Sequence, residues 1–360
     1  MKNLLCFSHL GWNFVYQRPQ HLMSRFKTKY NVYYFEEPKA SDFDGLLVEE
    51  EDGIKIIKLY FNSEHGFHAD KVRDEISKFL KKEHITSYDC WYYTPMALEF
   101  TDHLLPETVI FDSMDELSAF RFAPAKLRDL EEELFRNADL VFTGGNALFE
   151  AKKHRHHNIH LFPSSIDKFH FEQARESHED TDDQKNIPYP RLGFFGVVDE
   201  RFDVDLLRKI AEARPQWNFI IIGPVVKISE DDLPKKENIH YLGSKEYGDL
   251  PRYISNWDIA LILFALNEST KFISPTKTPE YLSAGLPVIS TAITDVINPY
   301  GNEKLVHIAH NDEEFITQAE AILAGVDHSW LARVDKFLEG NSWDITFEKM
   351  NAEIQKLNQI

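Results

Sequence analysis

The chain has 360 residues, of which 43% are hydrophobic, and its 40 Lys and Arg stand against 59 Asp and Glu for a formal net charge of -19. The length predicts two domains, and the acidic balance disfavours a nucleic-acid partner, because neutralising phosphates requires a surplus of basic residues. Cys6 and Cys90 are too few for a disulfide framework and indicate a reducing compartment.

The first segment, MKNLLCF, is apolar over too few residues to be a signal peptide and predicts a strand instead. No apolar run approaches the ~20 residues that a membrane-spanning helix needs. We therefore expect a cytoplasmic protein. A helical pattern at 70–83 carries Lys78, Lys81 and Lys82, which indicate either an ordinary solvated helix face or a peripheral contact with the inner face of a membrane.

Short β-branched or aromatic runs alternate with longer helical patterns in the first half of the chain. This alternation is typical of βαβ units and a parallel sheet. The expected strands are 4–7, 32–35, 54–59, 90–93, 109–111, 140–142 and 159–162, and the expected helices are 18–28, 70–83, 126–137 and 146–154.

A polar, acidic segment at 171–188 then predicts a surface linker between domains. After it the alternation begins again, so we expect an α/β protein with two Rossmann-like domains facing a cleft. The N-terminal domain would occupy 1–170 and the C-terminal domain 189–340, followed by an amphipathic helix at 341–360. The expected strands of the second half are 191–195, 218–222, 239–241, 259–262, 288–290 and 305–308, and the expected helices are 203–213, 247–255, 276–284, 312–325 and 328–338.

The strongest local signal is a buried strand at 259–263 that opens into a polar loop before a new helix begins near 275–278. A helix N-terminus offers backbone N–H groups and a positive dipole end, which can hold a diphosphate. We expect Glu280, early in this helix, to accept hydrogen bonds from ribose hydroxyls. Ordinary helix capping explains the same residue types, so both interpretations stay open. The residues expected at the diphosphate are Ser274, Thr276, Lys277 and Thr278.

The run SPTKTPEYLSAGLPVIST resembles the donor-binding signature of retaining glycosyltransferases with the GT-B architecture, in the GT4-like glycosyl transferases group 1 family. The segments ADLVFTGGNALFEAKK and LFPSSIDKFHF resemble the end of that family's first domain, with Ser164 and Ser165 where Asn-Gly is commoner. The resemblance covers 139–169 and 189–295. It implies an acceptor-binding first domain and a nucleotide-sugar-binding second domain. It also implies Glu280 as the ribose ligand and a terminal helix that packs back on the first domain.

One position departs from the family pattern. The family often has a second glutamate eight residues before the ribose glutamate, and that position here is Phe272. Glu268, in the preceding loop, is the alternative carboxylate. A non-catalytic nucleotide-sugar-binding module therefore stays open beside the enzyme.

The second domain opens with RLGFFGVVDERFDVDLLRKI. Gly196 ends a strand where the backbone can approach a phosphate, so we assign it to the donor site. By the resemblance, a basic residue in this segment stabilises the leaving diphosphate, which predicts Arg201 and Lys277 as an electrostatic clamp with a catalytic role. A surface position for Arg201 beside Asp199 is the alternative.

Asp203 and Asp205 form a DxD pattern in the same segment. In another glycosyltransferase architecture such a pair chelates a divalent cation. Here an apolar helix follows directly, so capping by Asp203 explains the pattern, and we predict no metal and no cofactor.

The loop after the first strand, SHLGWNFVYQRPQHL, falls at the carboxyl end of that strand, where α/β sheets bind ligands. Gly11 permits close approach and is assigned to the donor site. Trp12 is expected to stack on a sugar of the acceptor, and Arg18 and His21 to make polar contacts with it. Packing of the loop aromatics between the domains is the alternative.

The strand at 109–111 runs into a cluster of acids. Asp112 and Asp115 are expected to orient the acceptor hydroxyl or assist its deprotonation, and Glu116 to contact the acceptor. Acids placed at a helix N-terminus for the helix dipole are the alternative.

These residues together predict a glycosyltransferase that moves a sugar from a nucleotide diphosphate sugar to a hydroxyl of a glycan or lipid-linked acceptor. The resemblance implies retention of configuration and a place in polysaccharide or cell-envelope synthesis. A nucleotide-sugar isomerase or epimerase of the same architecture is the competing enzyme class.

Overall fold

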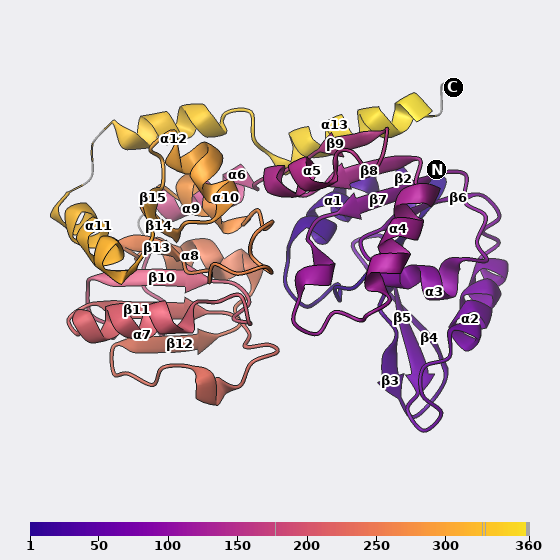
Figure 1. The fold of residues 1–360 in the computed structure, drawn as a ribbon, viewed down its shortest axis with the longest axis horizontal. Coiled ribbons are helices and arrows are strands. Elements are labelled where there is room, and N and C mark those ends of the chain that lie inside the picture. Colours follow the sequence, from indigo (N-terminus) through magenta and orange to yellow (C-terminus); the bar gives the residue numbers. More distant parts are fainter. Residues whose placement is uncertain (177, 326, 328, 358–360) are drawn as a thin grey trace. The chain divides into compact units, whose positions relative to one another are not determined.

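The computed structural model describes residues 1–176, 178–325, 327 and 329–357. The chain divides into two compact units (Figure 1). Among the described residues, unit 1 comprises Met1–Pro163 and Thr346–Leu357, and unit 2 lies within Ser164–Ile345. This division differs from the expected one, because the polar segment at 171–188 lies within unit 2.

Unit 1 is built on a nine-stranded sheet in the order β3-β5-β2-β1-β6-β7-β8-β9, with β4 paired antiparallel to β5. The central strand β1 pairs in parallel with β2 on one side and β6 on the other. Every residue of β6 and β8 is buried, as expected for parallel strands covered on both faces. The strands are β1 Lys2–Ser8, β2 Tyr30–Glu36, β3 Lys39–Ser41, β4 Gly45–Glu51, β5 Ile54–Asn62, β6 Tyr88–Tyr92, β7 Val109–Ser113, β8 Leu140–Thr143 and β9 Ile159–Leu161.

The helices of unit 1 are amphipathic and place one apolar stripe on the core. In α2 the buried residues Val72, Ile76, Phe79 and Leu80 recur at the helical spacing. Among the residues described, no helix combines the length and the apolar character needed to cross a membrane. The helices are α1 Arg18–Phe26, α2 Ala69–Lys82, α3 Leu98–Thr101, α4 Leu127–Asn137 and α5 Asn146–Lys152, with 3-10 turns η1 Pro95–Ala97 and η2 Leu117–Ala119.

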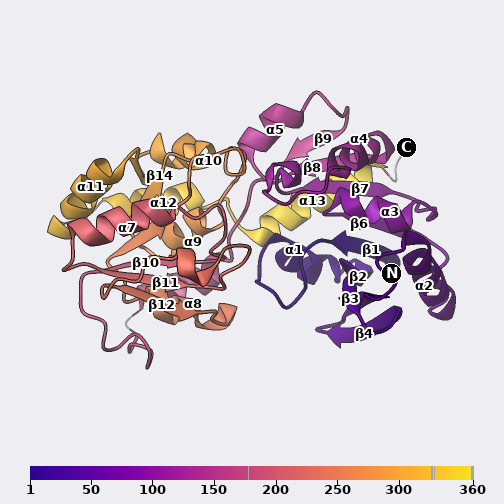
Figure 2. The same ribbon diagram turned by 60° about the horizontal axis from the view of Figure 1, so that its bottom comes forward.

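The C-terminal helix α13 (Trp343–Leu357) confirms the predicted return to unit 1 (Figure 2). Ser342 caps it, since the Ser342 hydroxyl accepts a hydrogen bond from the backbone N of Ile345 at 3.2 Å. Phe347 packs edge-on against Phe26 of α1, with ring centroids 4.9 Å apart. The helix therefore contributes to the core of unit 1.

Unit 2 contains a six-stranded parallel sheet in the order β12-β11-β10-β13-β14-β15. Helix α7 buries Leu206, Leu207, Ile210 and Ala211 on one side, again at the helical spacing. The strands are β10 Arg191–Phe195, β11 Asn218–Ile222, β12 Ile239–Gly243, β13 Ile259–Ile262, β14 Val288–Thr291 and β15 His307–Ala309. The helices are α6 Lys168–Glu172, α7 Val204–Ala213, α8 Leu250–Ile254, α9 Lys277–Ser283, α10 Thr294–Val296, α11 Asp312–Ala324 and α12 Trp330–Leu338.

The segment expected as a linker is held on unit 2 by the buried side chain of Arg191, which is 1% exposed. Its guanidinium donates to both carboxylate oxygens of Asp180, at 2.7 and 3.0 Å, and to the backbone carbonyls of Gln184 and Ile187. Gln184 in turn accepts a hydrogen bond from the indole N–H of Trp257 at 2.9 Å. The segment at 171–188, called the acidic strap below, therefore has the composition of a linker but is fixed to unit 2 by polar contacts.

We expect the substitution Arg191→Met to destabilise unit 2 by about 3 to 5 kcal/mol, because it removes the ion-pair partner of Asp180 and the donor to the carbonyls of Gln184 and Ile187. Chemical denaturation would measure the loss. The matched control is Arg214→Met, which removes an exposed pair with Glu320 and is expected to cost less than about 1 kcal/mol. Equal losses in the two variants would contradict the role of Arg191.

Candidate functional site

The strand order of unit 2 reverses beside β10. From β10 the chain proceeds outward to β11 and β12, and then returns to β13 on the other side of β10. In open α/β sheets, ligands bind at the carboxyl ends of the strands where the order reverses. The loops after β10 and β13 meet at this point: Ala265 N donates to Arg201 O at 2.8 Å, and Asp203 N donates to Leu263 O at 3.0 Å.

Gly196 is the first residue after β10, and the side chain of Lys277 occupies the position where a Cβ would lie. Its φ is +134°, and a Cβ at this position would lie 2.3 Å from Lys277 Cε and 2.5 Å from Nζ. Gly223, after β11, has a φ of +137°, and a Cβ there would lie 1.9 Å from Gly196 O. Because neither glycine has a side chain, the ends of β10 and β11 can approach each other. The ammonium of Lys277 can likewise contact the backbone of Gly196 directly.

The ammonium of Lys277 also lies near two aromatic rings. Its Nζ is 5.3 Å from the ring centroid of Phe194 and 5.6 Å from that of Phe264. Such cation–π contacts stabilise a cation that is partly removed from water. Lys277 is partly buried, so a positive charge is positioned where the strand order reverses.

Arg201 forms an ion pair with Asp199, whose side chain is buried and 4% exposed. The Nε of Arg201 lies 3.0 and 3.1 Å from the two carboxylate oxygens of Asp199, and Nη2 lies 2.7 Å from Oδ2. The carboxylate orients the guanidinium and offsets part of its charge.

Glu280 lies within α9 and is 5% exposed. Burial raises the pKa of Glu280 to about 7; Lys277 acts in the opposite direction, and the charge of Asp167 adds to the increase. Carboxylates perturbed in this way are concentrated at functional sites. Thr278, fully buried on the same helix, has an Oγ1 atom with no hydrogen-bond partner. Helix α9 thus carries a buried carboxylate with a raised pKa and a buried hydroxyl without a hydrogen-bond partner.

The last four residues of the segment LFPSSID, 164–167, belong to unit 2 and contact this site. The Ser164 hydroxyl donates to the carbonyl of Ser274 at 3.2 Å, and Asp167 acts electrostatically on Glu280. Sequence reasoning gave Asp167 no role. The resemblance of LFPSSID to a family segment was the available signal, but its position beside Glu280 depends on the tertiary fold. Ser274 and Thr276 are partly buried in the loop that leads into α9.

Phe272 and Glu268 occupy the same loop. The ring of Phe272 lies 5.4 Å from the ammonium of Lys271, and Glu268 is exposed in a turn. The carboxylate that acts on Glu280 is that of Asp167.

Asp203 caps α7, as predicted for the DxD pattern. Its side chain accepts a hydrogen bond from Leu206 N at 2.9 Å. Asp205 pairs with Arg208 on the same helix. The two carboxylates therefore have structural partners of their own.

In unit 1, Arg18 and Asp112 lie in the interior rather than at an accessible site. Arg18 is 2% exposed and Asp112 is fully buried. The guanidinium makes a bidentate pair with Asp112, with contacts of 2.8 and 2.9 Å, and donates to the carbonyl of Phe162 at 2.8 Å. His21 is also 2% exposed and packs edge-on against Tyr16. This geometry favours structural roles over the expected catalytic role of Asp112 and the acceptor contacts of Arg18 and His21.

Trp12 belongs to the core of unit 1, so its geometry does not favour sugar stacking. It is 6% exposed and packs edge-on against Tyr34, with ring centroids 5.0 Å apart. Its backbone N donates to Glu36 Oε1 at 2.9 Å, and Gln20 donates to its carbonyl at 2.7 Å. A Cβ on Gly11 would lie an ordinary 3.6 Å from the same carboxylate, so space alone does not require glycine there.

Glu116 belongs to a partly buried ion-pair network. It lies 3.0 Å from the ammonium of Lys152, which is 2% exposed and also contacts Glu131. Burial works to raise the pKa of Glu116, but Lys152 and the hydroxyl of Ser118 together hold it below the usual value. Asp115, the preceding residue, is partly buried.

Most of unit 2 resembles a known protein family. Residues 189–325 match the model of the family described as glycosyl transferases group 1. They form a domain of that family. Gly196, Arg201, Lys277 and Glu280 all lie inside the glycosyl transferases group 1 domain, whereas Asp167 and the whole of unit 1 lie outside it.

Three relatives illustrate the extent of the similarity. A segment of 103 residues is 27% identical to the putative teichuronic acid biosynthesis glycosyltransferase TuaH of Bacillus subtilis, and it spans 28% of this chain and 26% of that protein. Sucrose-phosphate synthase from Thermosynechococcus elongatus matches over 100% of both chains, with a TM-score of 0.73 and 15% identity. The trehalose-6-phosphate structure from E. coli, bound with UDP-2-fluoro glucose, matches over 100% of this chain and 99% of the other, with a TM-score of 0.70 and 12% identity. The fold is therefore GT-B, with its group 1 domain in unit 2.

Proposed function

We propose that the chain is a glycosyltransferase that moves a sugar from a nucleotide diphosphate sugar to a hydroxyl of an acceptor. The observation that carries the proposal is the ammonium of Lys277 lying on Gly196, at the strand-order reversal of a glycosyl transferases group 1 domain. Bare glycine backbone and a fixed cation together suit a diphosphate. Glu280, on the same helix, would accept hydrogen bonds from the ribose hydroxyls.

The reaction breaks the bond between the sugar's anomeric carbon and the diphosphate oxygen and forms a bond from that carbon to the acceptor oxygen. Negative charge grows on the leaving oxygen as the first bond breaks, and Lys277 would stabilise it, assisted by Arg201. The acceptor proton passes to the departing phosphate or to Asp115. The sequence resemblance supports retention of configuration.

The relatives support a finer assignment. The E. coli structure holds a UDP sugar, and TuaH is named for the synthesis of a teichuronic acid. We therefore propose a uridine diphosphate sugar as donor and a glycan or lipid-linked acceptor in polysaccharide or cell-envelope synthesis. Cys6 and Cys90 are both free thiols, which supports a reducing, cytoplasmic location.

Calorimetric titration with UDP, GDP and dTDP tests donor binding, and release of the nucleotide diphosphate in the presence of acceptors tests transfer. We expect UDP to bind and its sugar to be transferred. Binding without turnover across an acceptor panel would instead favour a non-catalytic module. Conversion of the donor sugar without any acceptor would favour an isomerase.

We propose that Lys277 and Arg201, rather than a divalent cation, neutralise the diphosphate. The affinity for UDP is accordingly expected to be the same with magnesium and with EDTA, because the DxD carboxylates are engaged in capping and pairing. Titrations under both conditions measure this. A loss of affinity of about ten-fold or more with EDTA, equal to about 1.4 kcal/mol, would show that a metal takes part.

A further inference from the structure

The sheet of unit 1 ends in a strand with an open outer side. Strand β4 pairs with β5 along all seven of its residues, in one antiparallel register that runs from Gly45 opposite Tyr60 to Glu51 opposite Ile54. The other side of β5 pairs with β2 and β3. In the described part of the chain no strand pairs with the outer side of β4, which lies at the border of unit 1 (Figure 2). Backbone N–H and C=O groups on that side therefore face solvent.

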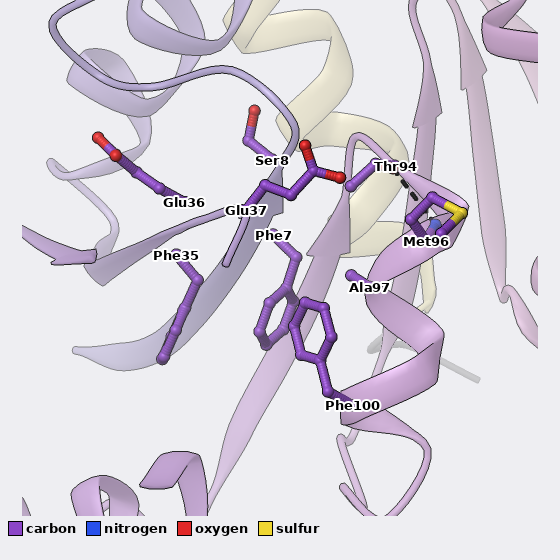
Figure 3. Close-up of a pocket in the computed structure, with 9 residues that line it drawn as sticks. All are labelled: Phe7, Ser8, Phe35, Glu36, Glu37, Thr94, Met96, Ala97 and Phe100. Carbon is purple, nitrogen blue, oxygen red and sulfur yellow. Dashed lines mark hydrogen bonds between the residues drawn. The ribbon is translucent and has the colours of Figure 1, made fainter. Parts of the chain in front are cut away.

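The strands behind β4 form a rigid support. On β2, Phe35 stacks on Phe7 of β1 with ring centroids 4.8 Å apart, and both rings are 1% exposed (Figure 3). Phe79 of α2 packs edge-on against Phe35 at 6.0 Å. On β5, Ile54 and Ile57 are fully buried. A strand held by such a sheet loses little conformational freedom when a partner binds to it.

The middle of β4 exposes two apolar side chains. Leu47 is 49% exposed and Val48 is 46% exposed. The strand contains neither proline nor lysine, and its register with β5 is free of a bulge. These are features by which natural proteins commonly protect an edge strand from pairing. The backbone of β4 is therefore suited to accept another strand, and charge is what limits which strand it accepts.

The charge around this edge is strongly negative. Residues 42–52 contain six acids and no basic residue. Three of the acids pair with lysines of neighbouring elements. Glu50 and Glu51 are exposed and form no ion pair with any of the residues that the structure describes. The six acids are Asp42, Asp44, Glu49, Glu50, Glu51 and Asp52.

This charge distinguishes between two kinds of partner. If two copies of the chain paired through β4, each acidic segment would lie against the other, and like charges on opposed strands are destabilising. A strand that carries lysine or arginine meets the complementary charge instead. The acids therefore disfavour a second copy and favour a basic partner.

We propose that β4 binds an extended segment of a partner protein as an additional antiparallel strand. The segment is basic where it pairs with Glu49–Glu51 and apolar where it meets Leu47 and Val48. Main-chain hydrogen bonds to β4 supply affinity, and the side chains select the partner. This inference concerns a protein–protein contact and is independent of the proposed function.

Peptide binding to the full chain tests the proposal. The probe is a fluorescein-labelled peptide, KKKVLVT, whose lysines lie opposite Glu51, Glu50 and Glu49 in the antiparallel register. Two matched peptides are the controls: EEEVLVT reverses the charge, and KKKVLVT methylated on every backbone nitrogen keeps the charge but cannot donate ladder hydrogen bonds. By fluorescence anisotropy, we expect KKKVLVT to bind at least about ten-fold more tightly than either control. Equal binding by one of the controls, or no binding of KKKVLVT up to about 1 mM, would overturn the proposal.

Charge-reversal variants place the bound peptide. The double variant Glu50→Lys, Glu51→Lys is expected to bind KKKVLVT at least about ten-fold more weakly than wild type. The double variant Glu237→Lys, Glu348→Lys makes the same change of charge at exposed glutamates outside β4 and is expected to bind within about two-fold of wild type. Equal affinities of the two double variants would remove the peptide from β4.

Two further measurements separate the possible occupants of this edge. Hydrogen exchange read by mass spectrometry is expected to slow in residues 45–51 when KKKVLVT is added, because their outward N–H groups become hydrogen-bonded. Protection confined to other segments would contradict the proposal. Sedimentation of the protein without peptide is expected to show no dimer that depends on β4. A dimer that Leu47→Lys abolishes would assign the edge to a second copy and overturn the proposal.

Discussion

Replacing Glu280 with glutamine is expected to stabilise the folded protein and to weaken donor binding at the same time. The two effects have one cause. A carboxylate that is 5% exposed is unfavourable in the free protein, but it accepts hydrogen bonds when ribose hydroxyls are present. If Glu280 served only in packing, its replacement would not raise the stability of the protein while lowering its affinity for the donor.

The stability effect has a defined dependence on pH. The pKa of Glu280 is about 7 in the folded protein against an ordinary 4.5, so the folded state holds more protons than the unfolded state between these values. The contribution of Glu280 to the free energy of unfolding therefore falls as pH rises from 4.5 and reaches its full cost above about 7. Glu280→Gln removes this cost, which is about 3 kcal/mol above that range and vanishes below 4.5.

Denaturation of wild type and variant across this pH range measures the difference, because groups that do not interact with Glu280 titrate alike in the two proteins. Calorimetry with UDP is expected to show a loss of about 1 to 3 kcal/mol in Glu280→Gln at neutral pH. The control is Glu268→Gln, which alters an exposed glutamate of the preceding loop and should change neither quantity. A variant that gains stability but retains full UDP affinity would remove Glu280 from the donor site.

Replacing Lys277 with alanine is expected to lower UDP affinity by about 1.5 to 3 kcal/mol, because a charge-assisted contact with phosphate is lost. The rate of transfer is expected to fall further, by about a hundred-fold or more, since charge on the leaving diphosphate grows in the transition state. The side chain also fills the space above Gly196, so Lys277→Met offers a variant that keeps the bulk and loses only the charge.

The matched control for this position is Lys271→Ala. Lys271 is an exposed lysine of the same loop, and its ammonium lies over Phe272. Titration with UDP and steady-state kinetics would be measured for the three variants. If Lys277→Met bound UDP as tightly as wild type, the anion site would have to be placed elsewhere in unit 2.

The regular elements were largely predictable because their signals are local. The period of buried residues in α2 and α7 and the short apolar runs of β10, β11 and β13 appear where the sequence predicts them. The strands β3 and β4 were missed. Most of β4 is exposed, so it has no apolar alternation to detect, and its existence depends on pairing with β5.

The segment from β13 through the polar loop into α9 was also predictable, because a strand, a loop and a helix that follow one another in sequence stay neighbours in space. Gly196 and Lys277 were named separately, and only the tertiary structure shows that one occupies the space left by the other. The influence of Asp167 on Glu280 likewise depends on a contact between distant parts of the chain.

The sequence by itself determined the α/β class, most helices and strands of both units, and the polar loop that leads into α9, because periodicity, capping and loop chemistry are local properties. The tertiary structure decided which polar residues are accessible. It paired Arg18 with Asp112 in the interior, placed Trp12 in the core, fixed the acidic strap on Arg191, and placed β4 at the border of its sheet. Burial and ion pairing are properties of contacts between segments, and no local pattern in the sequence encodes them.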